Sequence, residues 1–478
     1  MSIISLPVKC TLYLTTKSLP TIHQMQQIDR IIAEFSSLAW GYPLLLLLIG
    51  GGLYLFFRVR GLPFKYLSHA IALLSGRYDD PSSEGEISHF KALSTALAST
   101  IGMGNIAGVA VAISLGGPGA IFWMWISGLI GMCTKFFTCS LSIMYRGRDT
   151  HGKIQGGPMY FIMEGLGKKW KPMAIFFCMA GLIGALPVFN VNQLTQAIRD
   201  ILLVPNDLYV SGSSEGYIGF ILLVITSIVI LGGLKRIALT ASRLVPFMVV
   251  IYFICVLVIL MVHISEVPRY IALIFTDAFQ GNYVNRDSVA GGALGALIIL
   301  GIKRGAFSNE AGIGTAPMAH GASKTSEPIR EGLVAMLGPF IDTIIVCTLT
   351  AFAILVTGVW EMSESNGVTL TADAFGNSLP GVGQYLLLIC IAVFSISSLF
   401  SFSYYGTKCT SFLFGADRAK YYNIFYLLSI LIGATTSLDM MINLIDGFYA
   451  LMAIPTMVAT LLLAPKVVER AREYFGRI

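Results

Sequence analysis

Long runs of apolar residues constrain this chain more than any other feature of its sequence. A helix rises about 1.5 Å per residue and the hydrocarbon core of a bilayer is about 30 Å thick, so a spanning helix needs roughly 20 mostly apolar residues. Hydrophobic residues make up 55% of the 478 residues and charged residues only 12%, a balance typical of membrane proteins. The first run begins too late in the chain to be a secretory signal, so we expect it to be an uncleaved span. Polar breaks separate eleven predicted spans, near residues 42–57, 93–115, 119–145, 173–197, 216–233, 238–263, 287–302, 331–358, 382–406, 421–437 and 440–464.

Lysine and arginine test this division, because loops that stay in the cytoplasm collect basic residues. Every second loop is rich in them, from residues 58–91 to the C-terminal segment 466–478, whereas the connections 359–381 and 437–441 have none. The alternation predicts a bacterial inner-membrane protein with its N-terminus outside and its C-terminus in the cytoplasm. The net charge of +6 then reflects topology and attraction to anionic lipid heads rather than nucleic-acid binding. No feature implies an obligate protein partner.

Once the first span is set aside, the remaining ten divide into two sets of five. An odd number of spans per set turns the second set upside down, as in transporters built from inverted repeats. Glycine-rich interruptions are predicted at Gly102–Ile106 in the first span of one set and at Gly291–Gly295 in the first span of the other. Residues 266–280 are expected to form an amphipathic surface helix. The predicted organisation is 1–91 (external segment, extra helix and cytoplasmic linker), 92–265 (first five-helix repeat), 266–465 (second, inverted repeat) and 466–478 (cytoplasmic tail).

The interruption at Gly102-Met-Gly-Asn-Ile106 is the strongest candidate for a binding site. Unwound backbone at membrane depth is tolerated only inside the protein or beside a cavity. A half-helix N-terminus there offers N–H groups to a substrate carboxylate, and freed carbonyls can hold a sodium ion or an ammonium group. Alternatively, Gly104 and Gly108 could form a small-residue packing face between helices, and the spacing does not separate the two interpretations.

Polar residues within other spans add to this hypothesis. Asn190 and Gln193 lie one helical turn apart, so both can face the same interior space. Serine hydroxyls can join backbone carbonyls around a small hard cation, although they can equally form hydrogen bonds between helices. One span is crowded with such serines, namely Ser395, Ser397, Ser398, Ser401 and Ser403.

Charged residues at membrane depth are costly and should face the bundle interior or reach an interface. Asp342 is the better candidate for a buried functional carboxylate, whereas Lys135 could reach the interface along its own side chain and Asp446 could face the outer vestibule. The polar, glycine-rich segment 301–320 is predicted to lie at the cytoplasmic mouth. There it could form an ordered loop or a gate, and the candidate gate residues are Arg304, Asn309 and Glu310.

Other classes of protein fit less well. No HExxH motif, no GxSxG motif with an accompanying histidine and no paired carboxylates indicate an intramembrane enzyme, and interrupted helices in paired repeats argue against a channel. The eight cysteines include no CxxC pair, so neither a disulfide nor a bound metal cofactor is expected.

Several sequence blocks resemble the alanine or glycine:cation symporter family of the APC superfamily. They run in order from about Leu93 to Pro455 and read IGMGNIAGVAVAI, GGPGAIFWMWISGLIGMCTKF, GGPMYFI, GIKRGAFSNEAGIGTAPMAH, GLVAMLGPFIDTII and ALMAIP. The resemblance implies an all-α membrane protein with a LeuT-type five-plus-five inverted repeat and one extra N-terminal helix. It also implies sodium-coupled transport of a small amino acid such as alanine or glycine.

The same resemblance assigns roles to individual residues. It places the substrate pocket at Gly102, Met103, Gly104, Asn105, Ile106, Asn190, Gln193 and Phe402. By similarity to the wider fold, it places a sodium ion between the carbonyls of Ala98 and Ile101 and the hydroxyls of Ser397 and Ser398.

Four positions depart from the family pattern. Met103 and Thr195 replace a usual Thr and Asn, Thr138 replaces a Glu, and Phe402 replaces a Trp. These departures affect the prediction of the substrate and of the coupling ion rather than that of transport. The sequence therefore predicts a sodium-coupled importer of alanine, glycine or D-alanine, and the alternative is a divergent member that uses protons or carries another small zwitterion.

Overall fold

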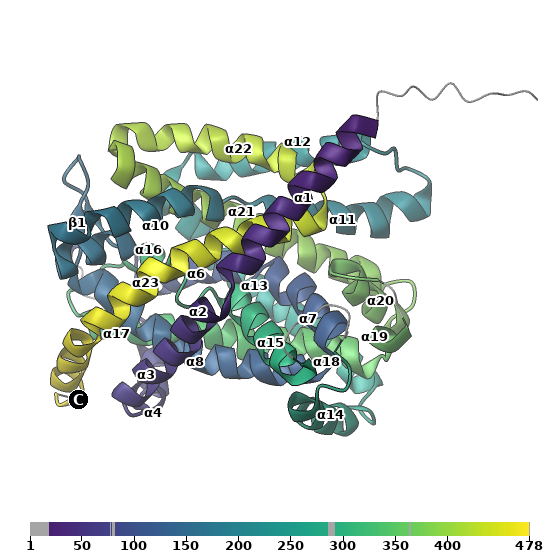
Figure 1. Cartoon of the computed structure of the whole chain (residues 1–478), viewed down its shortest axis with the longest axis horizontal. Coiled ribbons are helices and arrows are strands. Elements are labelled where there is room, and N and C mark those ends of the chain that lie inside the picture. The colour runs from purple at the N-terminus through teal and green to yellow at the C-terminus, as the bar shows by residue number, and fades with distance from the viewer. Residues whose placement is uncertain (1–18, 77, 79–81, 285–291, 363–364, 478) are drawn as a thin grey trace, which may run out of the picture.

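The computed structural model describes residues 19–76, 78, 82–284, 292–362 and 365–477, and most of them are helical. Many of the long helices run along the long axis of the molecule (Figure 1). One end carries the C-terminus and a short antiparallel hairpin, β1 (Gly147–Arg148) and β2 (Ile154–Gln155), and is called the hairpin end. The opposite end carries α14 (Val267–Gln280), α19 (Val359–Met362) and α20 (Val368–Ser378), and is called the α20 end. The pattern of basic loops predicts that the hairpin end faces the cytoplasm.

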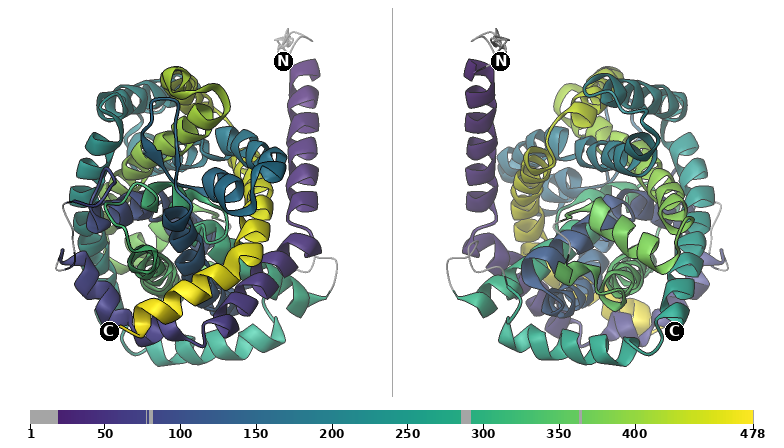
Figure 2. Two further views of the ribbon diagram at one scale, coloured as in Figure 1. Left: turned by 90° about the vertical axis from the view of Figure 1, so that its left-hand side faces the viewer. Right: turned by 90° about the vertical axis from the view of Figure 1, so that its right-hand side faces the viewer.

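The N-terminal span is longer than the predicted 42–57. Residues Gln27–Ala39 and Tyr42–Arg58 form two helical pieces that meet at an angle of 44°, and α1 stands along one side of the bundle (Figure 2). The ring of Phe35 packs so closely on Gly447 of α23 that a Cβ atom there would lie 2.3 Å from it. The segments of this region are α1 (Leu19–Ala39), α2 (Tyr42–Leu45), η1 (Leu46–Gly50), α3 (Gly51–Arg58), α4 (Leu62–Lys65) and α5 (Leu67–Leu74).

The first predicted repeat begins with a broken helix, as expected. Its two pieces, His89–Thr100 and Gly104–Gly116, are bent by 54° relative to each other. The elements are α6 (His89–Thr100), η2 (Gly104–Gly108), α7 (Val109–Gly116), α8 (Gly119–Met144), α9 (Pro158–Tyr160), η3 (Phe161–Gly165), η4 (Lys168–Trp170), α10 (Lys171–Gly184), α11 (Val188–Ile198), η5 (Arg199–Leu203), η6 (Val204–Asn206), α12 (Ser213–Ile230) and α13 (Gly233–Val262).

The second predicted repeat has a break at a place that we did not predict. Of the interruption predicted at Gly291–Gly295, Gly291 lies outside the described residues, Gly292 precedes α15 with a φ of 85°, and Ala293–Gly295 are the first residues of that helix. The helix stops at Glu310–Gly314, where three residues adopt the left-handed backbone conformation that ends an α-helix. Segment 301–320, predicted as a loop or gate, is therefore mostly helical. The elements are α15 (Ala293–Asn309), α16 (Thr315–His320), α17 (Pro328–Pro339), η8 (Phe340–Cys347), α18 (Thr348–Val356), α21 (Gly383–Phe414), η9 (Ala416–Arg418), α22 (Ala419–Thr435) and α23 (Leu438–Phe475).

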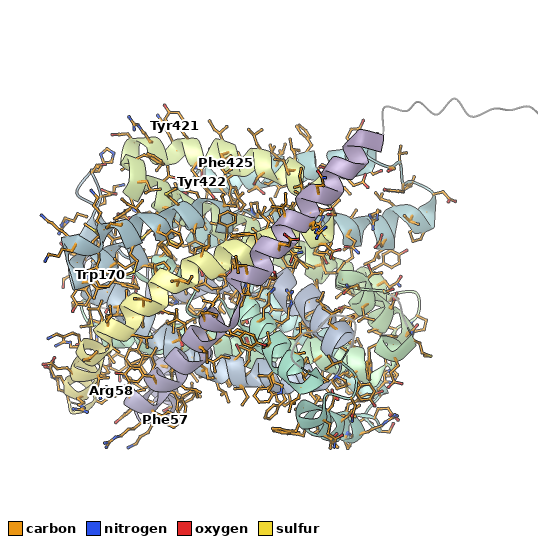
Figure 3. The ribbon with its side chains drawn as sticks, in the orientation of Figure 1. Phe57, Arg58, Trp170, Tyr421, Tyr422 and Phe425 are labelled. Atoms are coloured by element: carbon orange, nitrogen blue, oxygen red, sulfur yellow. The ribbon has the colours of Figure 1, made fainter. Side chains whose placement is uncertain are left out.

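The outer surface of the bundle is suited to lipid. In the described part of the chain, seven helices are long and apolar enough to cross a bilayer, and two bent pairs raise the number to nine. The predicted eleven would also require α15 and α22, which have 17 residues each. Tyr421 of α22 points away from the body (Figure 3), Phe425 is half-exposed, and large apolar side chains are exposed along α12 and α13 as well. Trp170 and Arg58 lie toward the hairpin end, where aromatic and basic residues can contact lipid headgroups.

Candidate functional site

The break after α6 is held open by two asparagine side chains. Ile101 has an extended backbone, with ψ at 90°, and leaves the helix. The freed N–H of Gly102 donates to Oδ1 of Asn105 at 3.0 Å, and the N–H of Met103 donates to Oδ1 of Asn190 on α11 at 3.2 Å. The unwound backbone thus finds its hydrogen-bond partners inside the protein, which is the condition for such a break at membrane depth.

The small-residue packing interpretation holds only in part. A Cβ atom on Gly104 would lie 3.3 Å from Cα of Ser308 on α15, so this glycine does allow a close approach of two backbones. A Cβ atom on Gly108 would meet nothing within 4 Å. The two glycines therefore do not form a common packing face, and the break is the main structural consequence of this motif.

A small cavity lies against the break. Its volume is about 20 Å³, which is room for about one water molecule. It is enclosed by both broken helices together with α11, α21 and α23. The lining residues are Ser99, Thr100, Gly102, Gly104, Leu186, Phe189, Asn190, Phe307, Glu310, Phe402, Ile445 and Tyr449.

Four of the eight residues predicted for the substrate pocket line this cavity, namely Gly102, Gly104, Asn190 and Phe402. The other four are buried but lie elsewhere. Asn105 turns its side-chain amide toward Oδ1 of Asp342, at 2.7 Å. Gln193 accepts a hydrogen bond from the N–H of Val368 on α20, at 3.3 Å. It lies one turn beyond Asn190 on α11 and therefore contacts the α20 end instead of the cavity. Met103 and Ile106 are fully buried and do not line the cavity.

Sequence reasoning missed Glu310 as a cavity residue. One carboxylate oxygen accepts a hydrogen bond from the Tyr449 hydroxyl at 2.9 Å, and the other accepts one from the Thr315 hydroxyl. The available signal was the pattern Glu310-Ala-Gly-Ile-Gly314, in which a polar residue is followed by closely spaced glycines, much as at Gly102–Asn105. This similarity was not used, because the second break was predicted at Gly291–Gly295.

The predicted gate at the cytoplasmic mouth is not formed by the three residues proposed for it. Glu310 lines the internal cavity, and Asn309 is fully buried and donates to the Thr343 hydroxyl at 3.1 Å. Arg304 is directed to Asp446 of α23, with Nη2 and Oδ2 3.5 Å apart. All three side chains lie in the interior of the bundle, because each has a buried partner on another helix or in the broken segment.

The remaining charged residues in the spans are also buried. Lys135 is 2% exposed, so its side chain does not reach the interface. Asp342 accepts hydrogen bonds from Asn105, from the Ser308 hydroxyl at 2.9 Å and from the Thr343 hydroxyl at 2.8 Å, which confirms it as a buried carboxylate.

Asp446, predicted to face an outer vestibule, is buried as well. Its carboxylate pairs with Nζ of Lys303 at 2.7 Å, and its main-chain carbonyl accepts a hydrogen bond from the Trp40 indole at 2.8 Å. This cluster links the N-terminal helix, α15 and α23.

Ser398, one of the residues predicted to bind sodium, lies beside the break. Its hydroxyl on α21 would be 2.6 Å from a Cβ atom on Gly102, which shows how closely α21 approaches the unwound segment. The hydroxyls of Ser397 and Ser398 both donate to the carbonyl of Phe394, at 2.8 and 3.1 Å, and the Ser397 hydroxyl also lies 3.6 Å from the sulfur of Met248 on α13. A hydroxyl that donates its proton keeps two lone pairs, and oxygen donors suit a hard cation such as sodium. Ala98 and Ile101 are buried at the C-terminal end of α6.

The hairpin end is closed by a buried carboxylate between two histidines. Nδ1 of His89, the first residue of α6, donates to one oxygen of Glu331 on α17, and Nδ1 of His320, the last residue of α16, donates to the other. All three side chains are at most 2% exposed. The contact therefore joins the ends of both broken helices to a third helix.

Arg146, just after α8, strengthens the same closure. Its guanidinium donates to the carbonyls of Gly321 and Thr325 at 3.0 Å each, to that of Glu84 at 3.1 Å, and to that of Ser323. The loop after α16 is thereby bound to the segment that precedes α6.

Two broken helices around an internal cavity, in a bundle with an apolar outer surface, define a secondary transporter of the membrane. The chain belongs to the sodium:alanine symporter family, whose sequence pattern matches residues 25–478. It is therefore a cation-coupled amino-acid symporter rather than an enzyme, and a multi-pass membrane protein.

Two relatives illustrate the range of the family. The sodium/alanine symporter AgcS of Methanococcus maripaludis is 39% identical over 93% of this chain and 96% of its own length. The probable sodium/glutamine symporter GlnT of Bacillus subtilis is 34% identical over 94% of this chain and 91% of its own length.

A solved structure agrees with this assignment at the level of the fold. The structure of MhsT in complex with L-phenylalanine covers 80% of this chain and 98% of its own, with a TM-score of 0.54 and 13% identity. The predicted LeuT-type fold is therefore confirmed.

Proposed function

We propose that this protein imports a small neutral amino acid, alanine of either hand or glycine, together with sodium, by alternating access around the cavity at the two broken helices. We place it in a bacterial inner membrane, with the hairpin end in the cytoplasm. One charge that crosses 100 mV supplies about 2.3 kcal/mol, so an inward sodium gradient can drive accumulation of the amino acid.

The observation that carries this proposal is the size and lining of the cavity. Besides its polar groups, the walls are the apolar side chains of Leu186, Phe189, Phe307, Phe402 and Ile445. With room for about one water molecule in this closed form, the walls must shift even for alanine, and they must shift further for each added side-chain atom. A methyl group or a hydrogen as the side chain is therefore the best fit.

Support for sodium comes from the family and from the hydroxyls beside the break. Oxygen ligands suit a hard cation, and the Ser398 hydroxyl next to Gly102 keeps its lone pairs free for one. The proposed ion site adjoins Gly102 of the proposed substrate site, so binding of the two solutes can be coupled through the unwound segment.

The test is uptake of radiolabelled alanine, glycine and glutamine into proteoliposomes, under an inward sodium gradient and separately under an inward proton gradient. We expect saturable uptake of alanine or glycine that requires sodium and stops when gramicidin collapses the gradient. Faster uptake of glutamine would contradict the assigned substrate, and uptake driven only by protons would contradict the assigned ion.

A pair of variants tests the position of the ion site. Ser398→Ala should raise the sodium concentration needed for half-maximal uptake. Ser403→Ala is the matched control, because Ser403 is a buried serine of the same helix whose hydroxyl also donates to a main-chain carbonyl, that of Phe400 at 2.7 Å, and it lies more than one turn from Ser398. Equal sodium dependence in the two variants would remove Ser398 from the ion site.

A further inference from the structure

Glu310 is a buried carboxylate without a cationic partner at ion-pair distance. It is 3% exposed, and its two hydrogen-bond donors, Tyr449 and Thr315, are neutral hydroxyls. Among the described residues, no lysine, arginine or histidine forms an ion pair with it, and Lys135 acts on it only at longer range.

Other buried carboxylates of this protein have more partners. Asp446 has Lys303 within 2.7 Å, Glu331 lies between two imidazoles, and Asp342 accepts hydrogen bonds from three side chains, whereas Glu310 accepts only two. Burying a carboxylate away from water costs much free energy unless a cation or several hydrogen bonds offset it. Glu310 is thus incompletely compensated in this closed state, and a bound cation would complete its surroundings.

The cavity itself indicates which cation. Glu310 contributes to the cavity wall, as do Gly102, Gly104 and Asn190 of the break. Of the described residues that line it, Glu310 alone carries a carboxylate. A group that suits an ammonium therefore lines the same small space as the unwound segment.

We propose that Glu310 binds the ammonium group of the transported amino acid. The inference rests on the proposed function in that the transported molecule is an amino acid, but it does not depend on which neutral one. Because both charged groups of an α-amino acid are attached to the same carbon, the apolar walls then face its side chain. Glu310 thereby becomes a determinant of specificity for a free amino group.

The experiment measures binding to the purified protein in lipid nanodiscs at saturating sodium. The affinity of the amino acid is compared with that of the analogue that lacks the amino group, in the pairs alanine and propionate, glycine and acetate, and glutamine and glutaramate. The pair whose amino acid the wild type binds most tightly is used. If the wild type binds glutamine most tightly, alanine and glycine are not the preferred substrates and that part of the proposed function is wrong. The role of Glu310 can still be tested with glutamine and glutaramate.

We expect the wild type to prefer the amino acid strongly, and Glu310→Gln to reduce that preference by about 10- to 150-fold, because a hydrogen bond between charged groups is lost. Glu310→Asp should keep part of the preference, since the charge remains at a shorter reach, and it serves as the second variant if Glu310→Gln does not fold. Glu331→Gln is the matched control, because it also removes a buried carboxylate but one outside the cavity, and its preference should equal that of the wild type.

Two results would overturn the proposal. One is a preference in Glu310→Gln within twofold of that of the wild type. The other is recovery of the wild-type preference in Glu310→Gln when sodium is raised further, which would make Glu310 a group that acts on the ion rather than on the amino group.

Discussion

Replacing Gly102 with alanine would put a methyl group where two helices meet the unwound segment. The new Cβ atom would lie 2.6 Å from Oγ of Ser398 and 3.1 Å from Oδ1 of Asn190. Overpacking of this kind costs about 1–3 kcal/mol. A shift of Asn190 would also weaken its hydrogen bond to the N–H of Met103, which adds about 1 kcal/mol. We therefore expect Gly102→Ala to destabilise the fold by about 2–4 kcal/mol.

The assay is thermal unfolding in detergent together with alanine uptake in proteoliposomes, and both should fall. Gly108→Ala is the matched control, because a Cβ atom at Gly108 would meet nothing within 4 Å. The double variant Gly102→Ala with Ser398→Ala should recover much of the lost stability, since the nearest remaining atom of residue 398 would be 3.7 Å from the new methyl group. It should nevertheless retain a raised sodium requirement if the Ser398 hydroxyl binds the ion.

The reasoning would be refuted if Gly102→Ala unfolded at the same temperature as Gly108→Ala. It would also be refuted if the double variant were no more stable than Gly102→Ala, because the close approach to Ser398 would then not be the cause.

Three further changes test other parts of the structure. Glu331→Gln weakens two charge-assisted hydrogen bonds, each worth about 1.5–3 kcal/mol, so its melting temperature should fall well below that of Glu473→Gln, which removes exposed ion pairs only. Asp446→Asn leaves two basic side chains without their counter-charge and should cost about 3–5 kcal/mol in unfolding; a loss below 1 kcal/mol would mean that the pairs are not formed in the membrane. Sodium at 100 times its dissociation constant should stabilise the wild type by about 2.7 kcal/mol relative to choline in the same thermal assay. A variant with Ser397 and Ser398 both changed to alanine should lose most of this stabilisation.

Most spans could be located from the sequence because lipid makes hydropathy a local property. A stretch either is or is not apolar enough to cross, whatever its neighbours are. The N-terminal span shows the limit of this reasoning. Arg30 and Glu34 lower the hydropathy of α1, so the predicted span began only at Tyr42, yet the two side chains pair with each other at 2.9 Å on the exposed face of the helix.

The break at Glu310–Gly314 was not predicted for a related reason. Between Arg304 and Glu310 the sequence carries many polar groups and reads as a loop. In the structure each of these groups has a buried partner far away in the chain, such as Asp446 for Arg304, Asp342 for Ser308 and Tyr449 for Glu310. Hydropathy measures the cost of burying each group by itself and cannot include partners that only the fold brings close.

The candidate site shows the same division between local and long-range information. The first break could be predicted because Gly102 and Gly104 lie within five residues of each other and are followed by Asn105. Asn190 reaches the cavity, whereas Gln193 contacts α20. This difference depends on how α11 is rotated about its axis relative to its neighbours. The spacing of residues along one helix does not determine that rotation.

Arg146 binds the loop after α16 only through main-chain carbonyls. Carbonyl groups are the same whatever side chain each residue carries, so Arg146 itself does not select the side chains at Ser323 and Thr325. Gly321 is restricted for a different reason, because a Cβ atom there would lie 2.6 Å from Cα of Gly156. An insertion or deletion in the loop would move the carbonyls out of the reach of one planar guanidinium. The contact therefore restricts the length of the loop, and Arg146 cannot be exchanged for lysine, whose single ammonium group does not span these acceptors.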